Sequence, residues 1–372
     1  MMQIAINGRF LVQATTGVQR VAREFTKALD ALVAAGELTD LKLRLLVPPG
    51  VAPDALPLRA ITVEPVGRFR AHSWEQLSLP AALRPGEILL NLGNTAPISS
   101  LLSSQPTVVM VHDLSHRVFP HAYRRRYRLP HAMLDRLVLQ RADLIITVAQ
   151  TERAHLQRIM PGAASRIVVA PNGGWSDTDN ADILPARDPA VPPYGLYVGS
   201  LSRRKNVDRV IASAVALARK RGLPFRIVGA ANPILTAIRT TVPSDVAPLI
   251  EFRGQMEDVA ALKAIYRDAA VLLFPSLYEA SALPPIEAMA QGCPVVASNI
   301  QSLIERCGDA ALYCDPDDVA SITAAVERVL DERELAARLR RNGRMLAGQL
   351  TWRAQVETVV AALARLGGDI VP

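Results

Sequence analysis

The sequence predicts an α/β protein with two Rossmann-like, doubly wound parallel-sheet domains that face a cleft. Three observations lead to this fold class. Short apolar segments alternate with longer segments of helical periodicity, the alternation stops once near the middle of the chain, and it then resumes. With 372 residues, 50% of them hydrophobic, each half can bury a core of its own.

The first half is expected to form a parallel sheet. Buried strands are predicted over 3–7, 42–47, 88–91, 107–112, 144–148 and 166–170. A helix is predicted over 19–35, because its apolar residues recur on one face: Val21, Phe25, Ala28, Leu29 and Leu32. Alternating strands and helices imply right-handed crossovers between parallel strands.

The segment 174–193 is rich in proline and aspartate and shows no periodicity, so it is expected to be a linker. A second series follows, with strands over 196–199, 225–228, 250–253, 271–275 and 295–297 and helices over 208–220, 257–268 and 284–291. The predicted organisation is a first Rossmann-like domain over 1–175, a linker over 176–193, a second Rossmann-like domain over 194–350 and a final helix over 351–372. In such folds, ligands bind beyond the carboxyl ends of the strands.

The net charge of +7 lies mostly in the first 180 residues, where 20 basic and 14 acidic residues give +6. No recognised nucleic-acid module accompanies it, so nucleic acid is not an expected partner. Cys293, Cys307 and Cys314 lack metal-ligand spacing and are expected to be free structural thiols. Without a signal peptide or a run long enough to cross a bilayer, the protein is expected to be cytoplasmic, soluble or peripheral.

Two features of the first half could contact a ligand. Gly17 lies in a loop between the first strand and a helix, where backbone N–H groups can bind a phosphate. An ordinary strand-to-helix loop is the alternative. His112 follows a strand and could bond a hydroxyl through its ring or its carbonyl, and a buried structural histidine is the alternative.

In the second half, a strand runs into the loop that contains Gly199, Ser200, Arg203, Arg204 and Lys205. Cations at a helix start oppose the helix dipole, so they indicate an external anion such as a diphosphate. The alternative is a solvated basic turn.

Glu279 and Glu287 are separated by seven residues around Leu283-Pro284-Pro285, which indicates a helix start. Glu279 is expected in the loop after a strand and Glu287 in the first helical turn. For Glu287 alone, a structural role is the alternative, since acidic residues favour helix N-termini.

Charged segments elsewhere suggest a membrane contact and no metal site. Arg124, Arg125, Arg126 and Arg128 could contact anionic headgroups, or form a solvated helix face. The Asp177-Thr178-Asp179 string matches a metal-binding pattern, but it lies in the linker, and 315–318 reads as a turn and helix cap. We therefore expect no metal.

Nearly the whole chain resembles the retaining glycosyltransferases of family 4, which have the two-domain GT-B fold. The segments that carry the resemblance include INGRFLVQATTGVQRVARE, WEQLSLP, VVMVHDLSHRVFP, YVGSLSRRKNVDRVI and YEASALPPIEAMAQGCPVVAS. The last of these, with its paired glutamates, is the most specific.

The resemblance implies transfer of a hexosyl unit from a nucleotide diphosphate sugar with retention at the anomeric carbon. It also implies that 1–175 is the acceptor domain, that 194–350 is the donor domain, and that the final helix over 351–372 crosses back to the first domain. By analogy, Glu287 would bond the ribose, Glu279 the donor sugar, and Arg204 and Lys205 the diphosphate. Gly17 would contact the phosphate and His112 the sugar. The other donor-binding residues would be Gly199, Ser200, Ser281, Ala282, Leu283 and Asn172.

The likeness to exopolysaccharide and O-antigen enzymes favours GDP-mannose as donor, ahead of UDP-glucose and dTDP-rhamnose, with no separate cofactor. It also implies a lipid-linked saccharide acceptor at the inner leaflet. A GT-B sugar-nucleotide epimerase and a non-catalytic nucleotide-sugar-binding protein are alternatives. Ala149, Ala280, Ser281 and Ala282 depart from the family pattern, and a positive φ at Ala282 would strain its Cβ.

Overall fold

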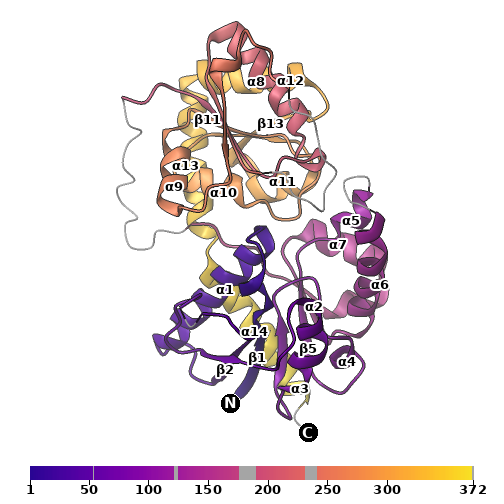
Figure 1. Cartoon of the computed structure of the whole chain (residues 1–372). Coiled ribbons are helices and arrows are strands. Elements are labelled where there is room, and N and C mark those ends of the chain that lie inside the picture. The colour runs from indigo at the N-terminus through magenta and orange to yellow at the C-terminus, as the bar shows by residue number, and fades with distance from the viewer. Residues whose placement is uncertain (53, 121–124, 176–189, 231–240, 371–372) are drawn as a thin grey trace. The chain divides into compact units, whose positions relative to one another are not determined.

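The computed structural model describes all residues except 53, 121–124, 176–189, 231–240 and 371–372. The chain divides into two compact units (Figure 1). The first contains Met1–Leu114, Leu129–Gly173 and Trp352–Pro372, and the second contains Ser115–Arg128 and Gly174–Thr351. Each unit is built around its own parallel sheet, which confirms the predicted fold class.

The first unit has a seven-stranded parallel sheet in the order β3-β2-β1-β4-β5-β6-β7. Its strands are β1 (Met2–Asn7), β2 (Leu41–Val47), β3 (Thr62–Pro65), β4 (Ile88–Asn91), β5 (Thr107–Val111), β6 (Leu144–Thr147) and β7 (Ile167–Val169). The sequence predicted all of them except β3. This edge strand has no buried residue and includes Glu64 and Pro65, so it lacks the apolar run that marks the other strands.

Helices flank this sheet, and the long ones bury an apolar face. The helical segments assigned to the unit are α1 (Gly17–Ala34), α2 (Ala71–Ser73), α3 (Leu79–Ala81), α4 (Ile98–Leu101), α7 (Gln150–Ile159), α14 (Trp352–Ile370), the 3-10 turns η1 (Gly8–Val12) and η4 (Pro161–Arg166), and the π-helical η2 (Trp74–Ser78). Between β5 and β6 the chain forms α5 (Ser115–Val118) and α6 (Arg125–Arg141).

The C-terminal helix α14 packs along α1 in the first unit (Figure 1). Val356 and Val359 of α14 are fully buried, and Gln355 donates a hydrogen bond to the carbonyl of Ala170 after β7 at 3.0 Å. On the other side, Arg353 pairs with Glu37 just after α1. The last helix of the chain is thus part of the first unit.

The second unit has a six-stranded parallel sheet in the order β10-β9-β8-β11-β12-β13. Its strands are β8 (Gly195–Val198), β9 (Phe225–Val228), β10 (Ile250–Gly254), β11 (Val271–Phe274), β12 (Val295–Ser298) and β13 (Ala311–Cys314). The helical segments are α8 (Val207–Arg221), α9 (Val259–Asp268), α10 (Leu283–Ala290), α11 (Gln301–Cys307), α12 (Val319–Asp331), α13 (Arg333–Gln349) and the 3-10 turns η5 (Arg203–Lys205), η6 (Ala247–Leu249) and η7 (Gly308–Ala310). The sequence missed β13.

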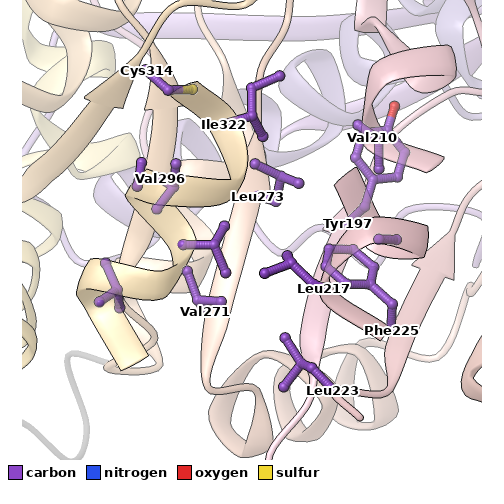
Figure 2. Packing of buried hydrophobic residues seen from close by; sticks show 14 of the residues in the cluster. Tyr197, Val210, Leu217, Leu223, Phe225, Val271, Leu273, Val296, Cys314 and Ile322 are labelled. Atoms are coloured by element: carbon purple, nitrogen blue, oxygen red, sulfur yellow. The ribbon is translucent and has the colours of Figure 1, made fainter. Parts of the chain in front are cut away.

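The core on one face of this sheet joins strand residues to α8 and α12. Figure 2 shows Tyr197, Phe225 and Leu273 of the strands packed with Leu217 of α8 and Ile322 of α12. All five are at most 1% exposed. This packing fixes the strand ends from which the neighbouring loops depart.

The three cysteines of the second unit are buried free thiols. Burial raises the pKa of each thiol to about 12, so all three remain protonated near neutral pH. This agrees with the structural role predicted for them.

Two glycines allow backbone segments to approach closely next to strand ends. A Cβ on Gly8, directly after β1, would lie 2.6 Å from the carbonyl oxygen of Leu46. A Cβ on Gly229, after β9, would lie 1.8 Å from the carbonyl oxygen of Gly199, and Gly229 has a φ of +138°. Only glycine fits at either position without moving the loop. In the part of the chain that the structure describes, no helix is both long enough and apolar enough to cross a membrane.

Candidate functional site

The candidate site of the second unit lies where the strand order reverses. β8 pairs with β9 on one side and β11 on the other, so the loops leaving β8 and β11 start from neighbouring strands. The backbone N–H of Leu277 donates to the carbonyl of Arg204 at 2.9 Å. Asn206 has a left-handed conformation with φ 59°, and its side-chain amide donates to the carbonyls of Pro275 and Pro316 at 2.9 and 2.7 Å. The two loops are therefore joined by hydrogen bonds.

A buried ion pair lies between these loops. The Nζ of Lys205 is 2.6 Å from Oε1 of Glu279, and the side chains are 10% and 6% exposed. The same ammonium lies 4.8 Å from the ring centroid of Phe274. Nη1 of Arg204 is 3.8 Å from Oε2 of Glu279 and donates to the carbonyl of Tyr278 at 3.3 Å.

This pairing changes the interpretation of the basic loop. The sequence indicated that its cations require an external anion, whereas Lys205 is already balanced by Glu279 from the other loop. Arg204, Lys205 and Glu279 together carry a charge of +1. The site therefore combines one carboxylate acceptor with an excess of positive charge, which suits a ligand that has both hydroxyl groups and an anionic group.

A buried tyrosine supports the loop that contains Gly199 and Ser200. The Oη of Tyr197 donates to the carbonyl of Ser200 at 2.9 Å. Burial, reinforced by the negative charge of Glu279, raises the pKa of Tyr197 well above its usual range, so the hydroxyl remains a donor. The hydroxyl of Ser200 also lies 3.3 Å from that of Ser202.

The start of α10 corrects one prediction. Glu287 was expected in the first turn, but α10 begins at Leu283, so Glu287 is its fifth residue. Pro284 and Pro285 occupy the second and third positions, where a missing N–H costs no intrahelical bond. Ala282 precedes the helix with a φ of −65°, so its Cβ is not strained. Leu283 is 8% exposed, and the hydroxyl of Ser281 is buried without a hydrogen-bond partner among the described residues.

Glu287 is held by a residue that the sequence analysis did not identify. The hydroxyl of Tyr266, in α9, donates to Oε2 of Glu287 at 3.0 Å, and the two residues are 0% and 2% exposed. The ring of Trp175 lies edge-on to Tyr266 with centroids 5.7 Å apart. Tyr266 shares the apolar face of its helix and therefore reads as a core residue in sequence.

Two residues predicted in the first unit, Gly17 and His112, lie at a helix start and after a strand, respectively. Gly17 is the first residue of α1, where Gln19 accepts a hydrogen bond from the backbone N–H of Thr16. The ring Nε2 of His112 lies 2.9 Å from the carbonyl oxygen of Leu92, and burial lowers the pKa of His112. The neutral ring therefore donates to the backbone, as in the structural alternative.

The structure also describes Asn172 and the predicted cap at 315–318, but not the side chains of the basic and linker candidates. Oδ1 of Asn172 accepts from the side chain of Gln355 at 2.8 Å. Asp318 caps α12 by accepting from the N–H of Ala320 at 2.8 Å, which confirms the predicted cap. Several candidates lie outside the residues whose side chains the structure describes, namely Arg124, Arg125, Arg126, Arg128, Asp177 and Asp179.

Two family models match the chain. Residues 15–173 match "Glycosyltransferase Family 4", and residues 192–332 match "Glycosyl transferases group 1". Over 268 residues, the chain is 30% identical to the O-antigen chain mannosyltransferase B of Escherichia coli, with 66% of each protein covered. Over 334 residues, it is 23% identical to the O-antigen chain mannosyltransferase RfbU of Salmonella typhimurium, covering 87% of this chain and 90% of that protein. The chain is also 32% identical over 244 residues to the glycogen synthases of Mycobacterium tuberculosis, and this match spans 57% of their length.

Solved structures share the fold at low sequence identity. Sucrose-phosphate synthase from Thermosynechococcus elongatus superposes with a TM-score of 0.75 at 21% identity, over 99% of this chain and 100% of that one. Anabaena HepE in complex with UDP-glucose gives a TM-score of 0.71 at 15% identity, over 98% of this chain and 100% of that one.

Proposed function

The chain belongs to the family 4 glycosyltransferases and has their GT-B fold, and on that premise we propose that it is a retaining hexosyltransferase that acts without a metal ion. The proposed donor is a nucleotide diphosphate sugar, with GDP-mannose ahead of UDP-glucose and dTDP-rhamnose. The proposed acceptor is a lipid-linked saccharide at the cytoplasmic face of the inner membrane. The mannosyltransferase names of two relatives support the choice of sugar.

The observation that carries the proposal is the cluster of Lys205, Glu279 and Arg204 at the junction of β8 and β11. In the proposed reaction, the bond between the anomeric carbon and the diphosphate oxygen breaks, and the acceptor oxygen bonds to the same face of that carbon. The acceptor proton passes to the departing phosphate oxygen. Arg204 and Lys205 stabilise the negative charge that develops there, an effect worth about 3 kcal/mol for one well-placed donor.

The carboxylates are proposed to recognise the uncharged parts of the donor. Glu279 accepts hydrogen bonds from the sugar hydroxyls while it keeps Lys205 in place. Glu287, held by Tyr266, accepts from the ribose hydroxyls. Gly17 and His112 keep, as proposals, the phosphate and sugar contacts that the family resemblance implies.

The first experiment is a thermal-shift panel of GDP, UDP, dTDP and ADP sugars, each with and without EDTA. We expect one base to raise the melting temperature, with the same shift in EDTA, and the corresponding sugar to be transferred with retained anomeric configuration. Loss of the shift in EDTA would contradict metal independence. The absence of a shift with every nucleotide would contradict the donor site.

Variants of the basic loop test the residue assignment. Arg204→Gln is expected to lower kcat by at least ten-fold, because a charge that stabilises the leaving group is lost. Arg219→Gln is the matched control, since Arg219 pairs with Asp245 at the surface at 2.7 Å. Equal rates for the two variants would overturn the role of Arg204.

A further inference from the structure

A pocket in the first unit lies outside the site described above. It has a volume of about 370 Å³, in the range of small-molecule sites. Its walls come from the segment after β1, the segment after β2 and the start of α2, so it opens beyond the carboxyl ends of two neighbouring strands. The lining residues are Arg9, Val12, Gln13, Pro48, Pro49, Gly50, Arg70, Ala71 and His72.

The charge of the pocket favours an anion. Two guanidinium groups, those of Arg9 and Arg70, line it, and no carboxylate is among the lining residues. Arg70 makes no side-chain hydrogen bond or ion pair within the described part of the chain. Its charge is therefore available to a ligand.

Arg9 is held in place by a buried polar network. Its guanidinium lies 2.8 Å from Oε2 of Glu75, 3.3 Å from the hydroxyl of Thr95 and 2.7 Å from Nδ1 of His72. Glu75 is 1% exposed, and its Oε1 accepts from the side-chain amide of Asn7 at 2.9 Å. The contacts with Thr95 and His72 are hydrogen bonds, and the contact with Glu75 is an ion pair, so part of the donor capacity of the five N–H groups remains for a ligand.

His72 supplies a further hydrogen-bond donor. Because arginine only donates, the contact with Arg9 makes Nδ1 of His72 an acceptor and places the ring proton on Nε2. Partial burial and the nearby charge of Arg9 lower the pKa of His72, so the ring is neutral at pH 7. Arg9, Arg70 and His72 together present N–H donors from two elements.

The backbone that carries Arg70 and His72 has two unfavourable features. Ala71 between them has a φ of +50°, which is uncommon for a residue with a Cβ. The π-helical η2 follows directly, and its fully buried Trp74 donates to the carbonyl of Val66 at 2.8 Å. Conformations of this kind persist where the surrounding structure fixes them, and they are frequent at binding sites.

We propose that this pocket binds a phosphoryl group of the acceptor substrate, held by Arg9, Arg70 and His72. The identification of the ligand as the acceptor rests on the proposed transferase function, whereas the anion site itself rests on the residues of the pocket. Planar guanidinium groups bind phosphate oxygens in a bidentate manner, which favours a phosphate ester or diphosphate. Such a group occurs both on phosphorylated sugars and on lipid diphosphates.

The test measures binding of inorganic pyrophosphate by calorimetry to the full chain. An Arg204→Gln, Lys205→Gln and Glu279→Gln triple variant removes the charges of the donor site without leaving one partner of the buried pair alone. Within this background, Val12→Asp and Val12→Asn form a matched pair, because the side chain is 48% exposed and only the charge differs. We expect binding at one site that is at least ten-fold weaker in Val12→Asp than in Val12→Asn.

A second pair of variants checks the cation directly. Arg70→Gln is expected to weaken pyrophosphate binding several-fold, while Arg68→Gln, two residues earlier and outside the pocket, leaves it unchanged. No binding in the triple variant would overturn the proposal, as would equal affinities within the Val12 pair or equal affinities within the arginine pair.

Further ligands identify the source of the phosphoryl group. Tighter binding of glucose 6-phosphate than of geranyl diphosphate would indicate a phosphorylated sugar, and the reverse would indicate a lipid diphosphate. Acetate binding as tightly as phosphate would refute the preference for a phosphoryl group. The thermal-shift panel of nucleotide sugars tests the donor site in the unchanged protein, and the pyrophosphate titrations test the pocket in the triple variant. A failure of the pocket proposal can therefore be told apart from a failure of the proposed function.

Discussion

The ion pair between Lys205 and Glu279 gives the most direct test of how the proposed donor site is built. We consider three variants: Lys205→Met, Glu279→Gln and the combination of both. Lys205→Met keeps most of the side-chain length and removes the charge, so the buried Glu279 loses its partner at 2.6 Å and keeps Arg204 at 3.8 Å. The double variant removes both charges.

The expected magnitude follows from distance and burial. At 2.6 Å and an effective dielectric constant of about 20, the attraction is about 6 kcal/mol. The cost of desolvating both charges offsets much of this attraction, because the side chains are only 10% and 6% exposed. Each single variant should therefore lower the free energy of unfolding of the second unit by about 3 to 5 kcal/mol, and the double variant by clearly less than the sum.

The assay is unfolding in denaturant, with hydrogen exchange of peptides from the second unit as the readout. The first unit therefore does not contribute to the signal. A coupling energy of at least about 2 kcal/mol supports a desolvated pair. The exposed pair of Arg219 and Asp245, 2.7 Å apart, is the control and should show far weaker coupling. Each coupling energy comes from a double-mutant cycle, which compares the two single variants of a pair with the double variant. Equal coupling energies for the buried and the exposed pair would refute the argument that burial gives the Lys205–Glu279 pair its strength.

Three further predictions concern other parts of the structure. Tyr266→Phe should raise the KM for the nucleotide donor several-fold with little change in kcat, because Glu287 loses its hydroxyl partner; an unchanged KM would contradict this positioning role. Burial lowers the pKa of His112, so the unfolded chain binds a proton first and stability falls as the pH drops below about 6.5, by at most about 1.4 kcal/mol per pH unit. Denaturation at pH 7.5 and 5.5 should show a smaller fall in His112→Gln, and an equal fall would refute this assignment. Gly229→Ala should destabilise the second unit and weaken nucleotide binding, because its Cβ would overlap the carbonyl of Gly199; a wild-type melting temperature would show that the loop yields freely.

The sequence could predict elements whose signal is local. A buried parallel strand needs a continuous apolar run, so the positions of most strands were predictable. Ligands of such sheets bind at the loops that follow the strands, so the loops with Lys205 and Glu279 could be singled out as well. The start of α10 was also nearly correct, because two prolines mark it. The edge strand β3 was not predictable in this way, since an edge strand with a polar face has no apolar run.

Contacts between distant segments could not be read from the sequence. Lys205 and Glu279 are 74 residues apart, and Tyr266 meets Glu287 from another helix. Each residue taken by itself also fits a purely structural role: Lys205 as a solvated cation, Glu287 as an acidic residue near a helix start, and Tyr266 as a core residue. The sheet order brings them together, and no spacing along the chain indicates which partner each one takes.

The same arrangement occurs in both units, and it explains how a site can attract an anion with little excess charge. In the loops after β1 and β8, which are the first strands of the two units along the chain, a cation is held by a buried glutamate. Glu75 holds Arg9, and Glu279 holds Lys205. A long side chain that is already fixed loses little conformational freedom when a ligand binds, so affinity comes from pre-organised donors. Removing either glutamate should therefore weaken anion binding by disordering the cation, even though the local charge becomes more positive. This opposes the simple electrostatic expectation, and the sign of the change in affinity for Glu75→Gln decides between the two.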